Sequence, residues 1–205
     1  MTNRVFTIGH STHSLEKFIS LLTSYSVTAV CDVRSQPYSR LNPQFNRETL
    51  MQALAEHRIA YVFLGRELGA RSPDPSCYVD GKVDYDRLAQ TSLFRRGLER
   101  IREGAKRYVI ALMCAERDPL ECHRSILVAR HLVRLGFSVD HILHDAMLES
   151  HTKALERLVQ QLSLPREDLF HSPNEIIDEA YRIQGRRIAY KMRRHIPSGA
   201  LPVDR

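Results

Sequence analysis

The sequence lacks any apolar run long enough to cross a membrane, which excludes a membrane-spanning helix. Its first residues, Met1 to Phe6, contain neither a long apolar region nor a small-residue cleavage signature, so no secretory signal peptide is predicted. The chain has only four cysteines, and they lack the regular spacing of a disulfide framework. We therefore expect reduced thiols, a cytoplasmic location and no membrane partner.

Acidic residues are missing from one stretch near the C-terminus, where six basic residues follow without an intervening acid. They are Arg182, Arg186, Arg187, Lys191, Arg193 and Arg194. The other 24 basic residues balance the 24 acidic ones, so the net charge of +6 comes from this stretch. It is either a solvated helix face or a surface that binds nucleic-acid phosphates with release of counterions. In the second case the contacts would come from Arg186, Arg187, Lys191, Arg193 and Arg194.

Strand and helix patterns alternate along most of the chain. Apolar runs predict strands at residues 4–8, 27–33, 59–64, 108–113 and 137–143. Periodic patterns, caps and terminal glycines predict the helices between and after them, including one at residues 123–135 and one starting at Ser172. This order predicts an α/β, Rossmann-like three-layer fold with a mostly parallel sheet of about five strands, plus C-terminal helices. We divide the chain into an α/β domain, residues 1–162, and a helical extension with a basic face, residues 163–205.

The unusual residues follow the predicted strands. Gly9, His10 and Ser11 follow the first strand, Asp32 and Arg34 the second, Gly65 and Glu67 the third, and Cys114 and Glu116 the fourth. The carboxyl ends of parallel strands share one edge of a sheet, so these residues are predicted to meet in one crevice. The alternative is that the corners are polar only because loops generally are.

Four ordered motifs mark these corners: T-I-G-H-S-T, C-D-V-R-S-x-P-x-S, F-L-G-R-E-L-G and C-A-E-x-x-P-x-x-C-H-R-S. Together they cover roughly residues 5–145, and in this the chain resembles the DUF488 family of uncharacterised bacterial and archaeal proteins. The resemblance implies an α/β domain with these corners as its shared features. It carries over no established reaction, so the chemistry is inferred from residue types.

Three arginines near the strand ends, Arg34, Arg40 and Arg124, indicate that the ligand is an anion. Guanidinium groups bind phosphate or carboxylate in a bidentate manner, and the amides of the helix beginning near His123 would assist them. The alternative is that each arginine is a surface or salt-bridge residue. The substrate-binding set predicted for this crevice is Gly9, Ser11, Arg34, Arg40, Gly65, Glu67 and Arg124.

Cys114 and Cys122 have three interpretations. Either one could be a nucleophile, because a helix start and neighbouring His or Arg lower a thiol pKa. Both could bind zinc with His123 and with His144 or His10, although the spacing is not C-x2-4-C and adjacent Cys-His ligands are awkward for one ion. Both could be small buried hydrophobes. The ten-residue separation from Cys114 to Arg124 does not fit the C-x5-R loop of a cysteine phosphatase. We assign no metal ligands and expect no cofactor.

The remaining chemistry is acid and base catalysis near neutral pH, from carboxylates and histidines. The predicted catalytic set is Asp32, Cys114, Glu116, Cys122, His123 and His10. The alternative is that Asp32 and Glu116 only pair with arginines and hold the loops. The first hypothesis is an enzyme that hydrolyses or transfers a group on a phosphate- or nucleotide-containing substrate. The others are a nucleic-acid-binding module that uses the basic C-terminal helix and a Cys/His metal-binding protein.

Overall fold

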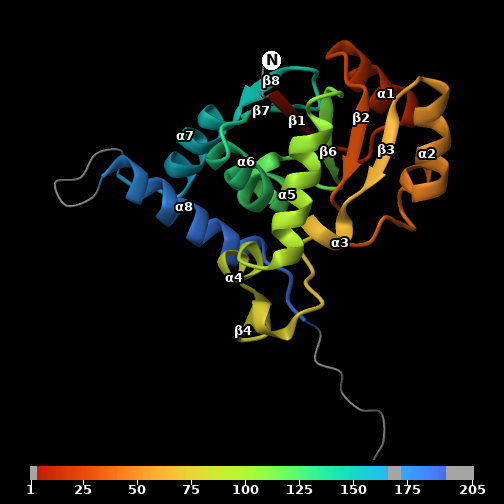
Figure 1. The fold of residues 1–205 in the computed structure, drawn as a ribbon. Helices are drawn as coiled ribbons and strands as arrows, with labels where there is room; N and C mark the ends of the chain where they lie inside the picture. The colour runs from red at the N-terminus through yellow and green to blue at the C-terminus, as the bar shows by residue number, and fades with distance from the viewer. Residues whose placement is uncertain (1–3, 166–171, 193–205) are drawn as a thin grey trace, which may run out of the picture.

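A computed structural model describes residues 4–165 and 172–192, and within them one twisted sheet forms the centre (Figure 1). Its strand order is β3-β2-β6-β1-β7-β8. The strands are β1 (Arg4–Gly9), β2 (Ala29–Asp32), β3 (Ala60–Phe63), β6 (Ile110–Cys114), β7 (Ser138–Ile142) and β8 (Leu148–Ser150). All neighbours pair in parallel except β7 and β8, which are antiparallel. The prediction of an α/β fold with a mostly parallel sheet is confirmed.

Helices cover both faces of this sheet, because successive side chains of a buried strand point to opposite sides. On β6, Ala111 and Met113 belong to the core shared with α1 (Leu15–Ser24) and α2 (Arg47–Glu56). Leu112 and Cys114 face the second core. The helices that contribute to that second core are α3 (Gly65–Leu68), α4 (Tyr85–Ala89), α5 (Ser92–Gly104), α6 (Arg130–Arg134), α7 (His151–Gln161) and α8 (Pro173–Ile188).

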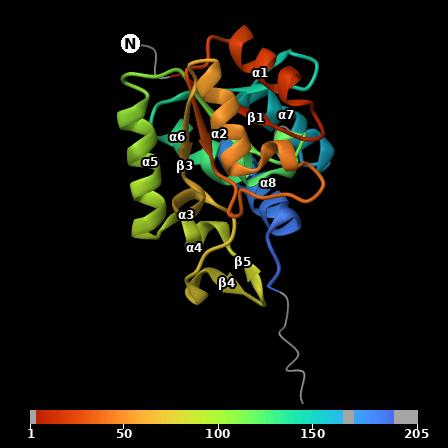
Figure 2. The same ribbon diagram turned by 90° about the vertical axis from the view of Figure 1, so that its right-hand side faces the viewer.

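Three features depart from the pattern expected from sequence. The β8 strand and a small hairpin of β4 (Tyr78–Val79) and β5 (Lys82–Val83) were not predicted, and the hairpin stands away from the central sheet (Figure 2). The helix predicted at residues 123–135 begins as a π-helical segment, Arg124–Ala129, and becomes α-helical only at α6. A π-helix closes its hydrogen bonds one residue further along the chain than an α-helix does. Over six residues the apolar pattern of the two helix types is too similar for the sequence to distinguish them.

The C-terminal helix α8 packs on the second core instead of projecting from it (Figure 1). Its first turn is closed by Ser172 and Glu175, which form the capping box expected from the sequence. Ile176, Ala180 and Tyr181 are buried against the α/β unit. The opposite face of the helix carries its basic residues in solvent.

Among the basic residues of this segment, Arg182 forms an ion pair with Glu179. Arg186, Arg187 and Lys191 are exposed. Arg193 and Arg194 lie outside the described residues. Within the described ranges, no helix combines the length and apolar character that a membrane crossing needs.

Candidate functional site

The connections of β1 and β6 diverge at their carboxyl ends. The chain leaves β1 through α1 toward β2, and it leaves β6 on the other face through α6 toward β7. Adjacent strands with oppositely directed connections create the place where α/β proteins bind ligands. Parallel pairing continues beyond both strands, since the amides of His10 and Ser11 donate to the carbonyls of Cys114 (2.9 Å) and Ala115 (2.9 Å). The two corners are thus held side by side.

Gly9 permits this close approach. A Cβ atom at Gly9 would lie 1.8 Å from the carbonyl oxygen of Glu116, so any side chain there would displace the following loop. Arg124 fastens the same loop, because its Nη1 donates to the Glu116 carbonyl (2.7 Å) and its Nη2 to the Arg117 carbonyl (3.2 Å). Arg124 is fully buried, and its Nε has no hydrogen-bond partner among the described residues. In this structure, therefore, the Arg124 guanidinium binds main-chain oxygens.

Asp32 and Arg34 form a buried ion pair at the end of β2. The Arg34 Nε and Nη2 donate to the two Asp32 carboxylate oxygens at 2.9 and 2.7 Å, and the Arg34 amide donates to the same carboxylate. Tyr61 of β3 donates a further hydrogen bond to Asp32 (2.7 Å). Burial and the Asp32 charge raise the pKa of Tyr61, which keeps its hydroxyl protonated as a donor. Asp32 therefore orients Arg34, which is the structural role considered as the alternative to acid-base catalysis.

His10 lies between this ion pair and the loop after β1. Its Nδ1 lies 2.9 Å from the Ser11 carbonyl, an acceptor, so Nδ1 carries the proton and Nε2 a lone pair. That lone pair faces the Nη1 of Arg34 at 3.3 Å. The ring also stacks on Phe45 with centroids 4.4 Å apart. Burial is the main cause that lowers the pKa of His10 to about 4, and Arg34 adds to it, so the ring is neutral at pH 7.

An open pocket of about 390 Å³ lies over these groups. It spans the ends of β1, β2 and β6 and the loop before α2, and it includes Ser11, whose φ of 47° lies in the left-handed region. Ser11 is one of six described non-glycine residues with a positive φ, so this angle marks a tight turn at the edge of the pocket. We call it the strand-end pocket; its lining residues are His10, Ser11, Thr12, Arg34, Gln36, Tyr38, Ser39, Asn42 and Ala115.

On the other face of the same edge, the buried side chains of Cys114, Cys122 and His123 form a second cluster, and the exposed Glu116 contacts it. The Nδ1 of His123 lies 3.8 Å from the sulfur of Cys114 and 3.8 Å from that of Cys122. The Cys122 sulfur also contacts a Glu116 carboxylate oxygen at 2.9 Å. The amide of Arg124 points at the Cys122 sulfur from the helix start (3.4 Å). We call these four residues the thiol cluster.

The thiol cluster is electrostatically coupled. Burial opposes ionisation of Cys122, but Cys114, Arg124 and His123 outweigh it and lower its pKa well below the usual value. The interaction with Cys122, followed by burial, raises the pKa of Cys114, and burial with the nearby Cys122 charge raises the pKa of Glu116. The Cys122 thiol donates to the Glu116 carboxylate, and although burial opposes it, the charges of Cys122 and Glu116 raise the pKa of His123. However, Cys122 exposes only 1% of its surface, so a substrate cannot reach this thiol in the described conformation.

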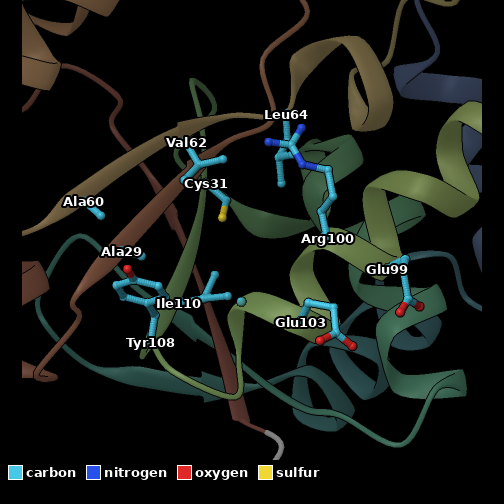
Figure 3. Close-up of a pocket in the computed structure, with 11 residues that line it drawn as sticks. Ala29, Cys31, Ala60, Val62, Leu64, Glu99, Arg100, Glu103, Tyr108 and Ile110 are labelled. Atoms are coloured by element: carbon cyan, nitrogen blue, oxygen red, sulfur yellow. The ribbon is translucent and has the colours of Figure 1, made fainter.

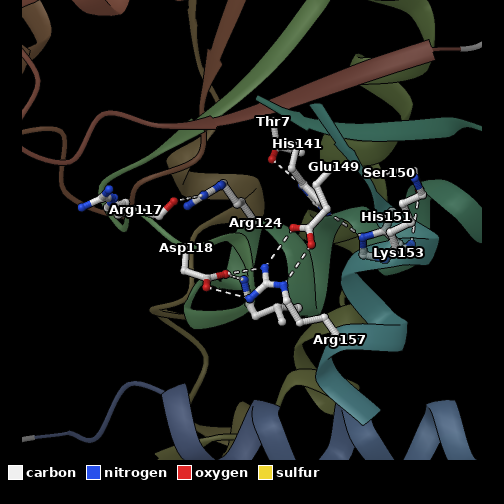
Figure 4. A network of polar contacts seen from close by, with 11 residues as sticks. Thr7, Arg117, Asp118, Arg124, His141, Glu149, Ser150, His151, Lys153 and Arg157 are labelled. Carbon is white, nitrogen blue, oxygen red and sulfur yellow. Dashed lines mark hydrogen bonds and ion pairs between the residues drawn. The ribbon is translucent and has the colours of Figure 1, made fainter. Parts of the chain in front are cut away.

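The loop that carries the thiol cluster is fastened by residues that the sequence analysis did not single out (Figure 4). Arg157 of α7 bridges two carboxylates, Asp118 at 2.8 and 3.0 Å and Glu149 of β8 at 2.9 and 2.9 Å. Gln184 of α8 donates to the Leu120 carbonyl at 2.9 Å. Asp118 before Pro119 is a recognisable turn cap, but nothing in the sequence pairs it with Arg157.

The third corner contributes less than expected. Gly65 lets this corner pack on the second, since a Cβ there would lie 1.9 Å from the Arg34 carbonyl oxygen. Glu67 turns away from the strand-end pocket and forms an ion pair with Arg100 of α5. Arg40 is exposed and does not line that pocket. Glu67 and Arg40 therefore do not join the site predicted for them.

A separate, mostly apolar pocket of about 360 Å³ lies between the sheet and α5 (Figure 3). Cys31, Val62 and Ile110 line its sheet side, whereas Glu99, Arg100 and Glu103 line its helix side. It contains no group from the predicted catalytic set. Cys31 is buried and burial raises its pKa to about 12, as expected for a structural thiol.

Comparison with known proteins identifies the family of this chain but indicates no reaction that it catalyses. Searches of curated proteins and of solved structures gave no match. A family model described as a domain of unknown function, DUF488, matches residues 14–131. The match contains the second, third and fourth corners, and it starts after the loop that follows β1. Because it spans more than half of the sequence, the chain belongs to the DUF488 family.

Proposed function

We propose that the protein is an enzyme that binds an anionic, phosphate- or nucleotide-containing molecule in the strand-end pocket and catalyses hydrolysis or group transfer there. The observation that carries the proposal is the fixed position of Arg34. Two of its nitrogens are held by Asp32, and Nη2 donates in addition to the Phe45 carbonyl (2.8 Å). Among the described residues, Nη1 contacts only His10, so one of its two N–H groups remains for a ligand in the pocket.

The surroundings of Arg34 favour recognition by hydrogen bonds more than by net charge, because Asp32 neutralises the guanidinium. Ser11 brings a hydroxyl, and Gln36 and Asn42 bring amides, to the same pocket, whereas the Tyr38 hydroxyl donates to Glu48 of α2. Arg34 is held by Asp32 and the Phe45 carbonyl, so its remaining N–H group needs little rearrangement when a phosphate oxygen arrives. A bound anion would also raise the pKa of His10 by favouring its charged form, which turns a neutral acceptor into a proton carrier near the ligand.

The test measures binding of inorganic phosphate, a nucleoside monophosphate and the corresponding nucleoside to the full-length chain by calorimetry. Ser11→Gly removes a pocket hydroxyl at a left-handed position that glycine tolerates well, so the fold should not suffer. Ser26→Gly is the matched control, because Ser26 has a φ of 54°, is exposed and does not line the pocket. We expect Ser11→Gly to weaken phosphate-dependent binding about tenfold, as for a hydrogen bond to a charged group, and Ser26→Gly to leave it unchanged.

Two results would contradict the proposal. One is that no phosphate-containing compound in the panel binds more tightly than the free nucleoside. The other is that Ser11→Gly and Arg34→Lys bind as the original chain does. Binding of the nucleoside alone would indicate that the pocket recognises a base or sugar and no anion.

A second candidate, nucleic-acid binding, is favoured by exposed basic residues at the end of α8 and just beyond it, since Lys191 follows the last helical residue, Ile188. Arg186, Arg187 and Lys191 are exposed and form no side-chain ion pair within the described residues, whereas Arg182 is neutralised by Glu179. Changing the first three to serine should weaken binding to DNA or RNA and lower its salt dependence. Arg182→Ser should have a smaller effect. If both changes act equally, or if neither alters binding, these basic residues form a solvated surface.

A further inference from the structure

The thiol cluster combines the ligand types of a transition-metal site, and three of its four members are buried together. Ligand atoms of Cys114, Cys122 and His123 all lie within 4.8 Å of one another, and all three residues are buried. Both cysteines belong to the core on the α5 and α6 side, whereas His10 in the strand-end pocket stacks on Phe45 of the opposite core. The cluster is therefore separate from the proposed ligand pocket.

His123 is oriented as a metal ligand is. Its Nε2 lies 3.0 Å from the Val33 carbonyl, which accepts a hydrogen bond and so fixes the proton on Nε2. The Nδ1 lone pair then faces the two sulfurs at equal distances of 3.8 Å. A metal-bound histidine almost always donates its second nitrogen to a carbonyl or carboxylate in this way.

The adjacency of Cys122 and His123 does not prevent both from reaching one point. Cys122 is extended, with φ −138° and ψ 138°, whereas His123 begins the helix with φ −60° and ψ −23°. This change of direction brings the two side chains to the same side. A strand end supplies the other sulfur, because Cys114 closes β6 beside Gly9.

Ligand separations are close to those of a tetrahedral zinc centre. With Zn–S of about 2.3 Å and Zn–N of about 2.0 Å, sulfur and nitrogen ligands lie roughly 3.5 Å apart. The sulfur-to-Nδ1 distances of 3.8 Å need only a small contraction. The Glu116 oxygen lies 2.9 Å from the Cys122 sulfur but does not belong to the set of ligand atoms within 4.8 Å of one another, so the exposed Glu116 side chain has to rotate to become a fourth ligand.

We propose that Cys114, Cys122, His123 and Glu116 bind one Zn²⁺ ion. Binding replaces the two thiol protons, which are released to water, and leaves two thiolates, a neutral imidazole and a carboxylate around the ion. The Arg124 amide donates to one of the thiolates. Since all four protein ligands are used and the cysteines are buried, the ion is structural: it joins the end of β6 to the start of the π-helical segment.

The first experiment uses the reduced, full-length chain and needs no variant. The chain is loaded with Zn²⁺ alone, desalted and analysed for metal, and the bound zinc is examined by X-ray absorption. We expect about one ion per chain, with two sulfur ligands near 2.3 Å and two nitrogen or oxygen ligands near 2.0 Å. A chain that retains no zinc, or zinc whose shell lacks sulfur, would overturn the proposal.

The second experiment identifies the ligands with Co²⁺, whose thiolate charge-transfer absorption reports Co–S bonds. Cys122→Ala should abolish this absorption and reduce bound metal to background. Cys77→Ala is the matched control, because Cys77 is equally buried but lies in a turn away from the cluster. Glu116→Gln should retain the Co–S absorption while weakening affinity at least tenfold. Equal metal loss in the Cys77 and Cys122 variants would refute the assignment.

Discussion

Acid should destabilise this protein through three buried histidines that are neutral at pH 7, namely His10, His141 and His151. His151 is 3% exposed, and its ring lies in a chain of contacts from His141 Nε2 (3.0 Å) to the Tyr181 hydroxyl (2.7 Å). His141 in turn contacts the Thr7 hydroxyl at 2.7 Å (Figure 4). This chain admits neutral rings, because protonation of both histidines would set two N–H groups against each other. Burial lowers the pKa of His151 from 6.5 to about 4.

The magnitude follows from the difference between folded and unfolded pKa values. His151 and His10 both titrate near 4 when folded and near 6.5 when unfolded. Between these values the unfolded chain binds more protons, so the stability that these groups contribute is present above pH 6.5 and is lost as the pH falls toward 4. Between pH 7 and pH 5 the loss is about 2 kcal/mol for each histidine.

Urea unfolding followed by circular dichroism at pH 7 and pH 5 measures this loss. The original chain should lose about 4 kcal/mol from His10 and His151 together, in addition to the contribution of His141, and His151→Gln should lose about 2 kcal/mol less. His57→Gln is the control, because His57 is exposed and should leave the pH dependence unchanged. The argument fails if the stability of the original chain is constant over this range, or if His151→Gln has the same pH dependence as the original chain.

Two further predictions concern the corners of the strand-end pocket and are checked by urea unfolding. Gly9→Ala should destabilise the fold by about 2–3 kcal/mol, because the added Cβ meets the Glu116 carbonyl at 1.8 Å; unchanged stability would mean that the loop yields freely. Asp32→Asn should cost about 3–5 kcal/mol by leaving Arg34 as a buried unpaired charge. Tyr61→Phe removes one hydrogen bond to the same carboxylate and should cost only about 1.5 kcal/mol. Equal costs for the two changes would contradict the ion-pair interpretation.

Strand positions and the meeting of corners were accessible from the sequence because both depend on local patterns. The apolar run at residues 108–113 predicted a buried strand, and β6 is Ile110–Cys114. The rule that parallel strands end at one edge then placed His10, Ser11 and Arg34 together, as the strand-end pocket has them. Short antiparallel elements such as β8 have only three residues and carry too little periodic signal to be seen.

Side-chain partners were much less accessible, because each charged group had several candidates within reach. Arg34 and Arg124 were grouped as anion ligands from their positions alone. The structure joins Arg34 to Asp32, two residues away, whereas Arg124 reaches back to the carbonyls of Glu116 and Arg117. The hydrogen-bond partners of Arg34 and Arg124 both depend on backbone torsion angles at the loop corners. Apolar periodicity does not predict those angles.

The thiol cluster illustrates the same limit for metal sites. The C-x2-4-C spacing rule describes ligands presented by one short loop, and here the two cysteines come from different elements. Cys114 is placed by sheet register, opposite Gly9, and Cys122 by the turn that begins at Asp118 and ends at the helix start. Seven residues lie between them in sequence, yet the fold directs both sulfurs at one imidazole nitrogen. The C-x2-4-C rule therefore does not predict this metal site. The site is favoured by the register of β1 and β6, and by the change from an extended backbone at Cys122 to a helical one at His123.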